Sequence, residues 1–81
     1  MRIRVRLFAR LRELTGEGEL ERSVADGATA RTLWTALAAE FPPLAQYESI
    51  VSSAVNEEYA KFETRLRDGD EVAFLPPVSG G

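Results

Sequence analysis

Residues 2–8 have the sequence RIRVRLF, in which arginine alternates with aliphatic side chains before a final phenylalanine. A period of two residues is typical of a β-strand that has one face in a core and the other in solvent. Ile3, Val5 and Leu7 are predicted to face inward, and the three arginines between them outward. We therefore expect residues 2–8 to form the first strand of a sheet.

The strongest helical pattern covers residues 30–41. Its apolar side chains recur at helical spacing and form one broad stripe: Leu33, Trp34, Leu37, Ala38 and Phe41. Thr29 is placed to cap the amino end of this helix, and Pro42-Pro43 stops it. Because an apolar stripe must be buried against a sheet, Trp34 and Phe41 are predicted to form the centre of the core.

The other segments predict shorter elements around these two. We expect one or two helical turns at 9–15, a strand at 19–24 antiparallel to the first, a loop at 44–48, a strand at 50–55, a turn at 56–58 leading to Tyr59 and Ala60, and a last strand at 71–75. The order is strand, strand, helix, strands, strand, with the helix crossing one face of a mixed sheet. This order predicts an α+β roll.

The composition excludes several classes of function. The chain has 81 residues, enough for one small domain, and it contains neither cysteine nor histidine. It therefore lacks disulfides, the usual zinc and iron–sulfur ligands and the usual general base, so we expect no metal site, no permanently bound cofactor and no free-standing enzyme. The net charge of −3 argues against nucleic acid as a ligand. With no signal peptide and no apolar run near the roughly 20 residues that span a bilayer, we expect a cytoplasmic protein without membrane contact.

The end of the chain has a different character. Pro76-Pro77 cannot continue a central strand, so we divide the chain into a domain, residues 1–75, and an extended C-terminal tail, residues 76–81. Six extended residues reach about 20 Å, far enough to enter another protein's active site. Gly80 and Gly81 have no side chains, which leaves the terminal carboxylate as the functional group. A carboxylate must be activated before it reacts, so the tail implies an ATP-dependent partner that forms an acyl-adenylate, which a sulfur or amine nucleophile displaces.

The stretch 68–81, DGDEVAFLPPVSGG, resembles the end of the molybdopterin synthase small subunit family, and residues 8–13 and 54–57 resemble other stretches of it. The resemblance implies a ubiquitin-like β-grasp fold whose first and last strands lie side by side and parallel at the sheet centre. It also implies a non-catalytic sulfur carrier. In that role an adenylating, E1-like enzyme activates Gly81 with ATP and a sulfur donor converts it to a thiocarboxylate. The large synthase subunit then transfers the sulfur to cyclic pyranopterin monophosphate, forming the dithiolene of molybdopterin.

A docking surface is predicted beside the tail. Phe8 lies opposite in parity to Ile3, Val5 and Leu7, and Leu75 lies opposite to its inward-facing neighbours on the last strand, so both are candidates for exposure. Tyr59 follows a polar turn and can join them in an apolar patch, and nearby arginines can pair with acidic partner groups. The predicted partner-binding residues are Phe8, Tyr59, Leu75, Pro76, Pro77, Val78 and Ser79.

Other roles share these features. A sulfur carrier for thiamine synthesis or tRNA thiolation would have the same fold and the same diglycine end. A ubiquitin-like modifier would use the activated Gly81 to form an isopeptide with a lysine. A β-grasp binding module would not need its terminal glycines, so deletion of Gly81 separates it from a carrier.

Overall fold

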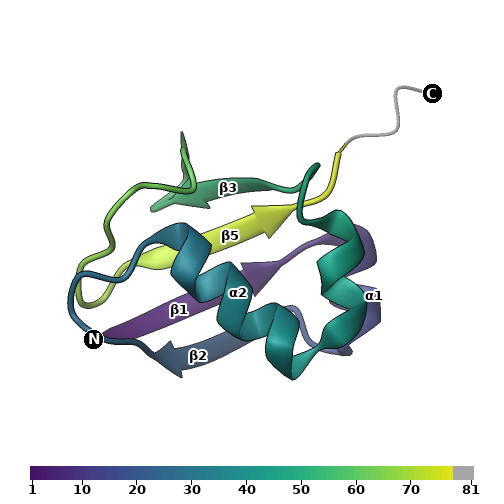
Figure 1. The fold of residues 1–81 in the computed structure, drawn as a ribbon, viewed down its shortest axis with the longest axis horizontal. Helices are drawn as coiled ribbons and strands as arrows, with labels where there is room; N and C mark the ends of the chain where they lie inside the picture. Colours follow the sequence, from purple (N-terminus) through teal and green to yellow (C-terminus); the bar gives the residue numbers. More distant parts are fainter. Residues whose placement is uncertain (78–81) are drawn as a thin grey trace.

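The structure, a computed structural model, describes residues 1–77 and consists of a sheet with its longest helix across one face (Figure 1). Residues 78–81 lie outside the described part. The elements in chain order are β1 (Arg2–Leu7), α1 (Ala9–Thr15), β2 (Glu19–Ser23), α2 (Ala30–Glu40), a 3₁₀ helix η1 (Pro42–Tyr47), β3 (Ser52–Val55), β4 (Glu58–Ala60) and β5 (Glu71–Leu75). The α+β prediction is confirmed.

The two ends of the domain meet in the middle of the sheet. The strand order is β2-β1-β5-β3-β4, and β1 pairs with β5 in parallel, with Val5 beside Val72 and Leu7 beside Phe74. The other pairs, β1 with β2, β5 with β3 and β3 with β4, are antiparallel. The parallel central pair that the family resemblance implied is confirmed, and the fold is a β-grasp.

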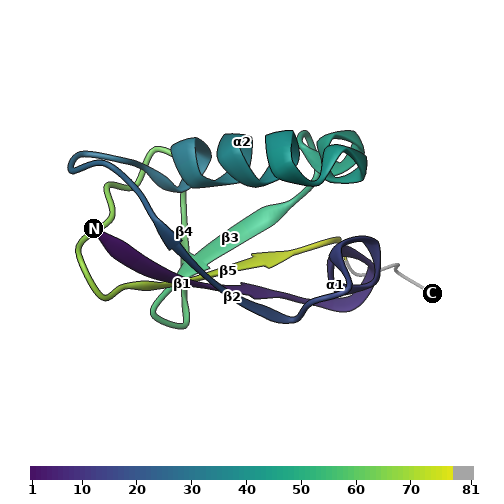
Figure 2. The same cartoon turned by 90° about the horizontal axis from the view of Figure 1, so that it is seen from below.

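The core lies between the sheet and α2, which covers one face only (Figure 2). Thr29 caps α2, accepting a hydrogen bond from the Thr32 amide at 3.2 Å in a reciprocal capping box. Trp34 is fully buried, with its ring centroid 5.0 Å from that of Phe74. Phe41 is only partly buried, so its predicted place at the centre was wrong. It is the C-cap residue of α2 and has a φ of −123° in place of the helical value of about −63°, which turns its side chain away from the helical stripe.

The segment after α2 differs from its prediction. The loop expected at 44–48 falls largely within η1. The first two residues of η1 are prolines, which are tolerated there because the first amides of a helix have no partner within the helix. The strand expected at 50–55 begins at Ser52. Ile50 and Val51 instead donate their amides to the Tyr47 carbonyl at 3.0 and 2.8 Å, so Ile50 lies in a turn and Val51 precedes β3 without joining it.

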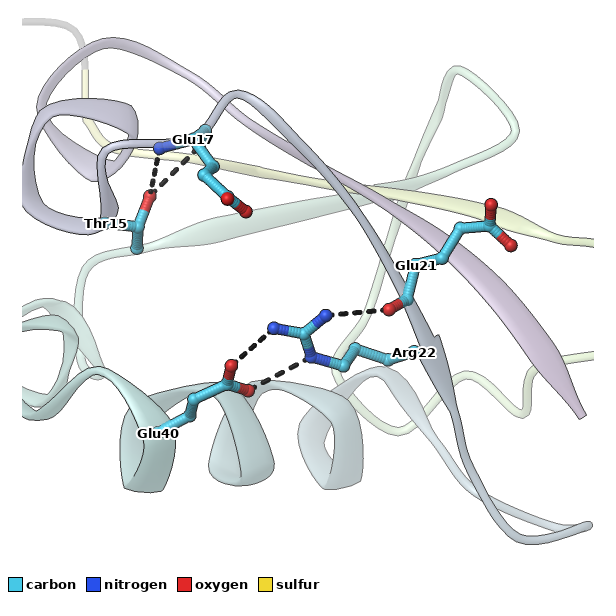
Figure 3. Close-up of polar contacts among 5 residues, drawn as sticks. All are labelled: Thr15, Glu17, Glu21, Arg22 and Glu40. Atoms are coloured by element: carbon cyan, nitrogen blue, oxygen red, sulfur yellow. Dashed lines mark hydrogen bonds and ion pairs between the residues drawn. The ribbon is translucent and has the colours of Figure 1, made fainter.

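Polar contacts fix the edge strand β2 and the end of α1 (Figure 3). Arg22 on β2 makes two hydrogen bonds to the Glu40 carboxylate at the end of α2, which ties the edge strand to the helix layer. Thr15 at the end of α1 accepts a hydrogen bond from the Glu17 amide at 3.2 Å. In residues 1–77 no helix has the length and apolar character that crossing a membrane requires.

Candidate functional site

The face of the sheet opposite α2 carries the candidate site. Residues of one parity on β1, β5, β3 and β4 lie on this face and form a row across four strands. The register sets Arg6 beside Ala73, Ala73 beside Ala54 and Ala54 beside Tyr59. Small side chains in the middle of this row leave a hollow between the larger ones.

Phe8, Tyr59 and Leu75 meet around this hollow, which has a volume of about 230 Å³. Tyr59 is 80% exposed, while Phe8 and Leu75 are half-buried. Ala54 and Ala73 also line the hollow. The sequence prediction missed both alanines, although Ala73 shares the parity of Leu75 and was open to the same argument. We call Phe8, Ala54, Tyr59, Ala73 and Leu75 the docking patch. The predicted clustering is thus present, and the partner-binding role of these residues stays a prediction.

Charged groups surround the docking patch. Arg6, Glu57 and Glu71 also line the hollow, and the Arg6 guanidinium carbon lies 5.0 Å from the centroid of the Phe8 ring. A cation over an aromatic face is attracted to the ring quadrupole, so Arg6 holds Phe8 in place from one side. An apolar centre with a charged rim is the usual composition of a transient protein interface.

The turn before Tyr59 is held by one side chain. Asn56 and Glu57 connect β3 to β4 and have positive φ of 51° and 70°. The Asn56 side chain accepts a hydrogen bond from the Glu71 amide at 3.0 Å and donates one to Asp70 at 2.9 Å. These bonds connect the turn to β5, which sets where Tyr59 stands relative to Leu75.

The chain leaves the sheet next to the docking patch. β5 ends at Leu75, Pro76 is half-buried and Pro77 is exposed. The other predicted site residues, Val78, Ser79, Gly80 and Gly81, lie outside the described residues. Within residues 1–77, acidic side chains form no group of three or more that is able to hold a metal ion.

Comparisons with known proteins identify a family and relatives of this chain. The model of the ThiS family matches residues 5–81. The molybdopterin synthase sulfur carrier subunits of Arabidopsis thaliana and Escherichia coli are each 42% identical to this chain. The alignments cover 98% of this chain in both cases and 82% and 99% of the two relatives.

Solved structures show the same fold. A putative molybdopterin converting factor subunit 1 from Pyrococcus furiosus has a TM-score of 0.86 at 31% identity, covering 96% of this chain and 99% of its own. The small archaeal modifier protein 1 of Methanosarcina acetivorans has a TM-score of 0.82 at 30% identity, covering 99% and 96%. A chain in the complex of subunits 1 and 2 of the Helicobacter pylori molybdopterin-converting factor has a TM-score of 0.71 at 27% identity, covering 100% of both chains. These matches confirm the resemblance stated from the sequence, and the chain belongs to the ThiS family.

Proposed function

We propose that this chain is the sulfur carrier subunit of a molybdopterin synthase and that Gly81 carries the sulfur. The observation that supports this most directly is the position of the docking patch at the end of β5, six residues before the end of the sequence. A partner that covers Phe8, Tyr59 and Leu75 stands beside the point where the chain leaves the sheet. The relatives that are 42% identical bear the name of this subunit.

The proposed chemistry takes place on the terminal carboxylate. An adenylating enzyme joins it to the AMP portion of ATP and releases pyrophosphate, and a sulfur donor then displaces AMP to leave a thiocarboxylate. On the large subunit, the sulfur passes to cyclic pyranopterin monophosphate, and water supplies the oxygen that makes Gly81 a carboxylate again as its C–S bond breaks. Since a dithiolene holds two sulfur atoms, each product consumes the sulfur of two loaded chains.

The domain's part in this chemistry is to bind and to present. The titratable groups that line the hollow of the docking patch are the Tyr59 hydroxyl, the carboxylates of Glu57 and Glu71 and the Arg6 guanidinium, and none of them lies in the tail that carries the proposed reaction. The reacting groups would therefore come from the partners, and this subunit alone would be inactive. The Helicobacter pylori structure contains two different subunits, which supports a large-subunit partner for this chain.

Reconstitution tests the proposed function. The chain, loaded with thiocarboxylate, is mixed with a molybdopterin synthase large subunit and cyclic pyranopterin monophosphate, and molybdopterin is measured as its fluorescent oxidised derivative. We expect product from the loaded chain and none from the unloaded chain or from a variant without Gly81. Loading without product formation would point instead to another acceptor, such as those of thiamine synthesis or tRNA thiolation.

A second candidate role, protein modification, is favoured by the likeness to a small archaeal modifier protein. In that role an amine displaces AMP and Gly81 becomes linked to a lysine. Incubation with the adenylating enzyme, ATP and a lysine-containing acceptor, without a sulfur source, separates the two roles. A covalent adduct that resists reducing agents would support modification, and a chain that stays free would count against it.

A further inference from the structure

A second hollow borders the docking patch on the side of α1. It has a volume of about 340 Å³ and shares Arg6 and Phe8 with the docking patch. Its other charged lining residues are Arg12 on α1 and Glu19 at the start of β2. We call this site the arginine hollow, formed by Arg6, Phe8, Arg12, Gly18 and Glu19.

In the arginine hollow, the side chain of Arg12 packs against Gly18. A Cβ atom on Gly18 would lie 3.1 Å from Nε of Arg12 and 3.3 Å from its Cζ, so the guanidinium lies directly against the glycine backbone. The Gly18 carbonyl accepts a hydrogen bond from the Leu7 amide at 3.0 Å, which fixes this wall to β1. Gly18 does not have positive φ, so its backbone conformation does not require glycine. The lack of a side chain instead leaves room for Arg12.

The charge in the arginine hollow is not balanced. The ion pairs found among residues 1–77 are Arg2–Glu21, Arg10–Glu13, Arg22–Glu40 and Arg31–Glu63, and none involves a residue of the hollow. Glu19 lies opposite Arg6 in the register of β1 and β2, and the hollow is lined by two arginines and this one carboxylate. The hollow therefore carries one net positive charge in a chain whose net charge is −3.

We propose that the arginine hollow receives a carboxylate side chain of the large synthase subunit when that subunit covers the docking patch. The planar fork of a guanidinium matches a carboxylate in a two-point contact, and the guanidinium of Arg12 lies close to Gly18 at the wall of the hollow. The shared residues Arg6 and Phe8 make the hollow continuous with the docking patch, so one partner covers both. This inference rests on the proposed function and adds a specificity element to it.

Arg12 and its neighbour Arg10 provide a matched pair of variants. Both lie on α1 and are exposed, and Arg10 pairs with Glu13 outside the hollow. R12E and R10E change the net charge by the same amount. Because both side chains are exposed, we expect both variants to fold, and melting curves check this. A third variant, G18A, keeps the net charge, and its added Cβ displaces the Arg12 side chain from its position against residue 18.

The association rate of each full-length variant with the large subunit is measured by stopped-flow at low and at high salt. We expect R12E to reduce the rate about tenfold at low salt, with less difference at high salt, because charges at an interface act mainly on encounter. R10E is expected to stay within about twofold of the unmodified chain, and G18A to fall between R10E and R12E.

Three results would overturn the inference. Equal association rates for R12E and R10E, with the unmodified chain still binding, would contradict the proposed carboxylate contact but would leave the proposed function in place. A loss confined to binding of the adenylating enzyme would assign the hollow to the other partner. Failure of the unmodified chain to bind the large subunit would overturn the proposed function as well.

Discussion

Replacement of Asn56 by alanine should destabilise the domain and disturb the docking patch together. Asn56 bridges the β3–β4 turn to β5 through its two side-chain hydrogen bonds, and it adopts φ of 51°. Asparagine adopts this left-handed conformation more readily than alanine does, so alanine at this position carries an additional energetic cost. The substitution therefore removes two bonds and adds backbone strain.

The size of the effect follows from these terms. The two hydrogen bonds are exposed to solvent, so each contributes about 0.5–1 kcal/mol. Alanine in the left-handed region adds about 1 kcal/mol. The free energy of unfolding should thus fall by about 2–3 kcal/mol, and each kcal/mol lowers the melting temperature by about 4–8 °C in a domain of this size.

Urea denaturation followed by tryptophan fluorescence measures this loss, because Trp34 is the single tryptophan and is fully buried. Asn56→Gly is the matched control. Glycine loses both side-chain bonds but adopts positive φ freely, so its loss should be about 1 kcal/mol smaller than that of Asn56→Ala. A loss below about 0.5 kcal/mol for Asn56→Ala, or equal losses for the two variants, would refute the reasoning.

Cap removal, truncation of the docking patch and one local titration provide three further tests. Thr29→Ala removes the cap of α2 and should lower the free energy of unfolding by about 1 kcal/mol in the same urea titration, and an unchanged midpoint would contradict the capping role. Tyr59→Ala should weaken binding to the large subunit by about 2 kcal/mol in calorimetry, while stability changes by less than about 0.5 kcal/mol because the side chain is 80% exposed. Unchanged affinity would remove Tyr59 from the interface. The pKa of Glu63 is lowered by its hydrogen bond from Arg31, so the pair stabilises the fold above the unfolded-state pKa of the carboxyl, and this contribution is lost as pH falls through the lower folded-state value. An NMR titration should show the pKa of Glu63 rising in Arg31→Gln, and equal midpoints would count against this assignment.

The periodic parts of the sequence predicted the fold because each has one buried side. The alternation in residues 2–8 and the helical stripe after Thr29 correspond to β1 and α2, since burial imposes a period on a strand or a helix. Ile50 and Val51, in contrast, were wrongly predicted to lie in a strand. Both are β-branched and read as strand, but carbonyl contacts with Tyr47 decide their conformation, and such contacts leave no period in the sequence.

The site was predictable to the extent that strand parity determines which side chains share a face. Parity placed Phe8 and Leu75 on the open face, and the structure brings both to one hollow with Tyr59. Ala54 and Ala73 lie side by side in the hollow of the docking patch because of the register of β3 against β5, which the sequence alone does not determine. The arginine hollow depends on the approach of Arg12 to Gly18, a tertiary contact between α1 and the segment before β2.

The intact mass of the chain after incubation with the adenylating enzyme, ATP and a sulfur source tests the central claim most directly. We predict that the mass rises by the difference between one sulfur and one oxygen atom, and that a variant without Gly81 shows no change under the same conditions. An unchanged mass of the full chain, with an adenylating enzyme that loads another carrier in a parallel reaction, would contradict the assignment as a sulfur carrier.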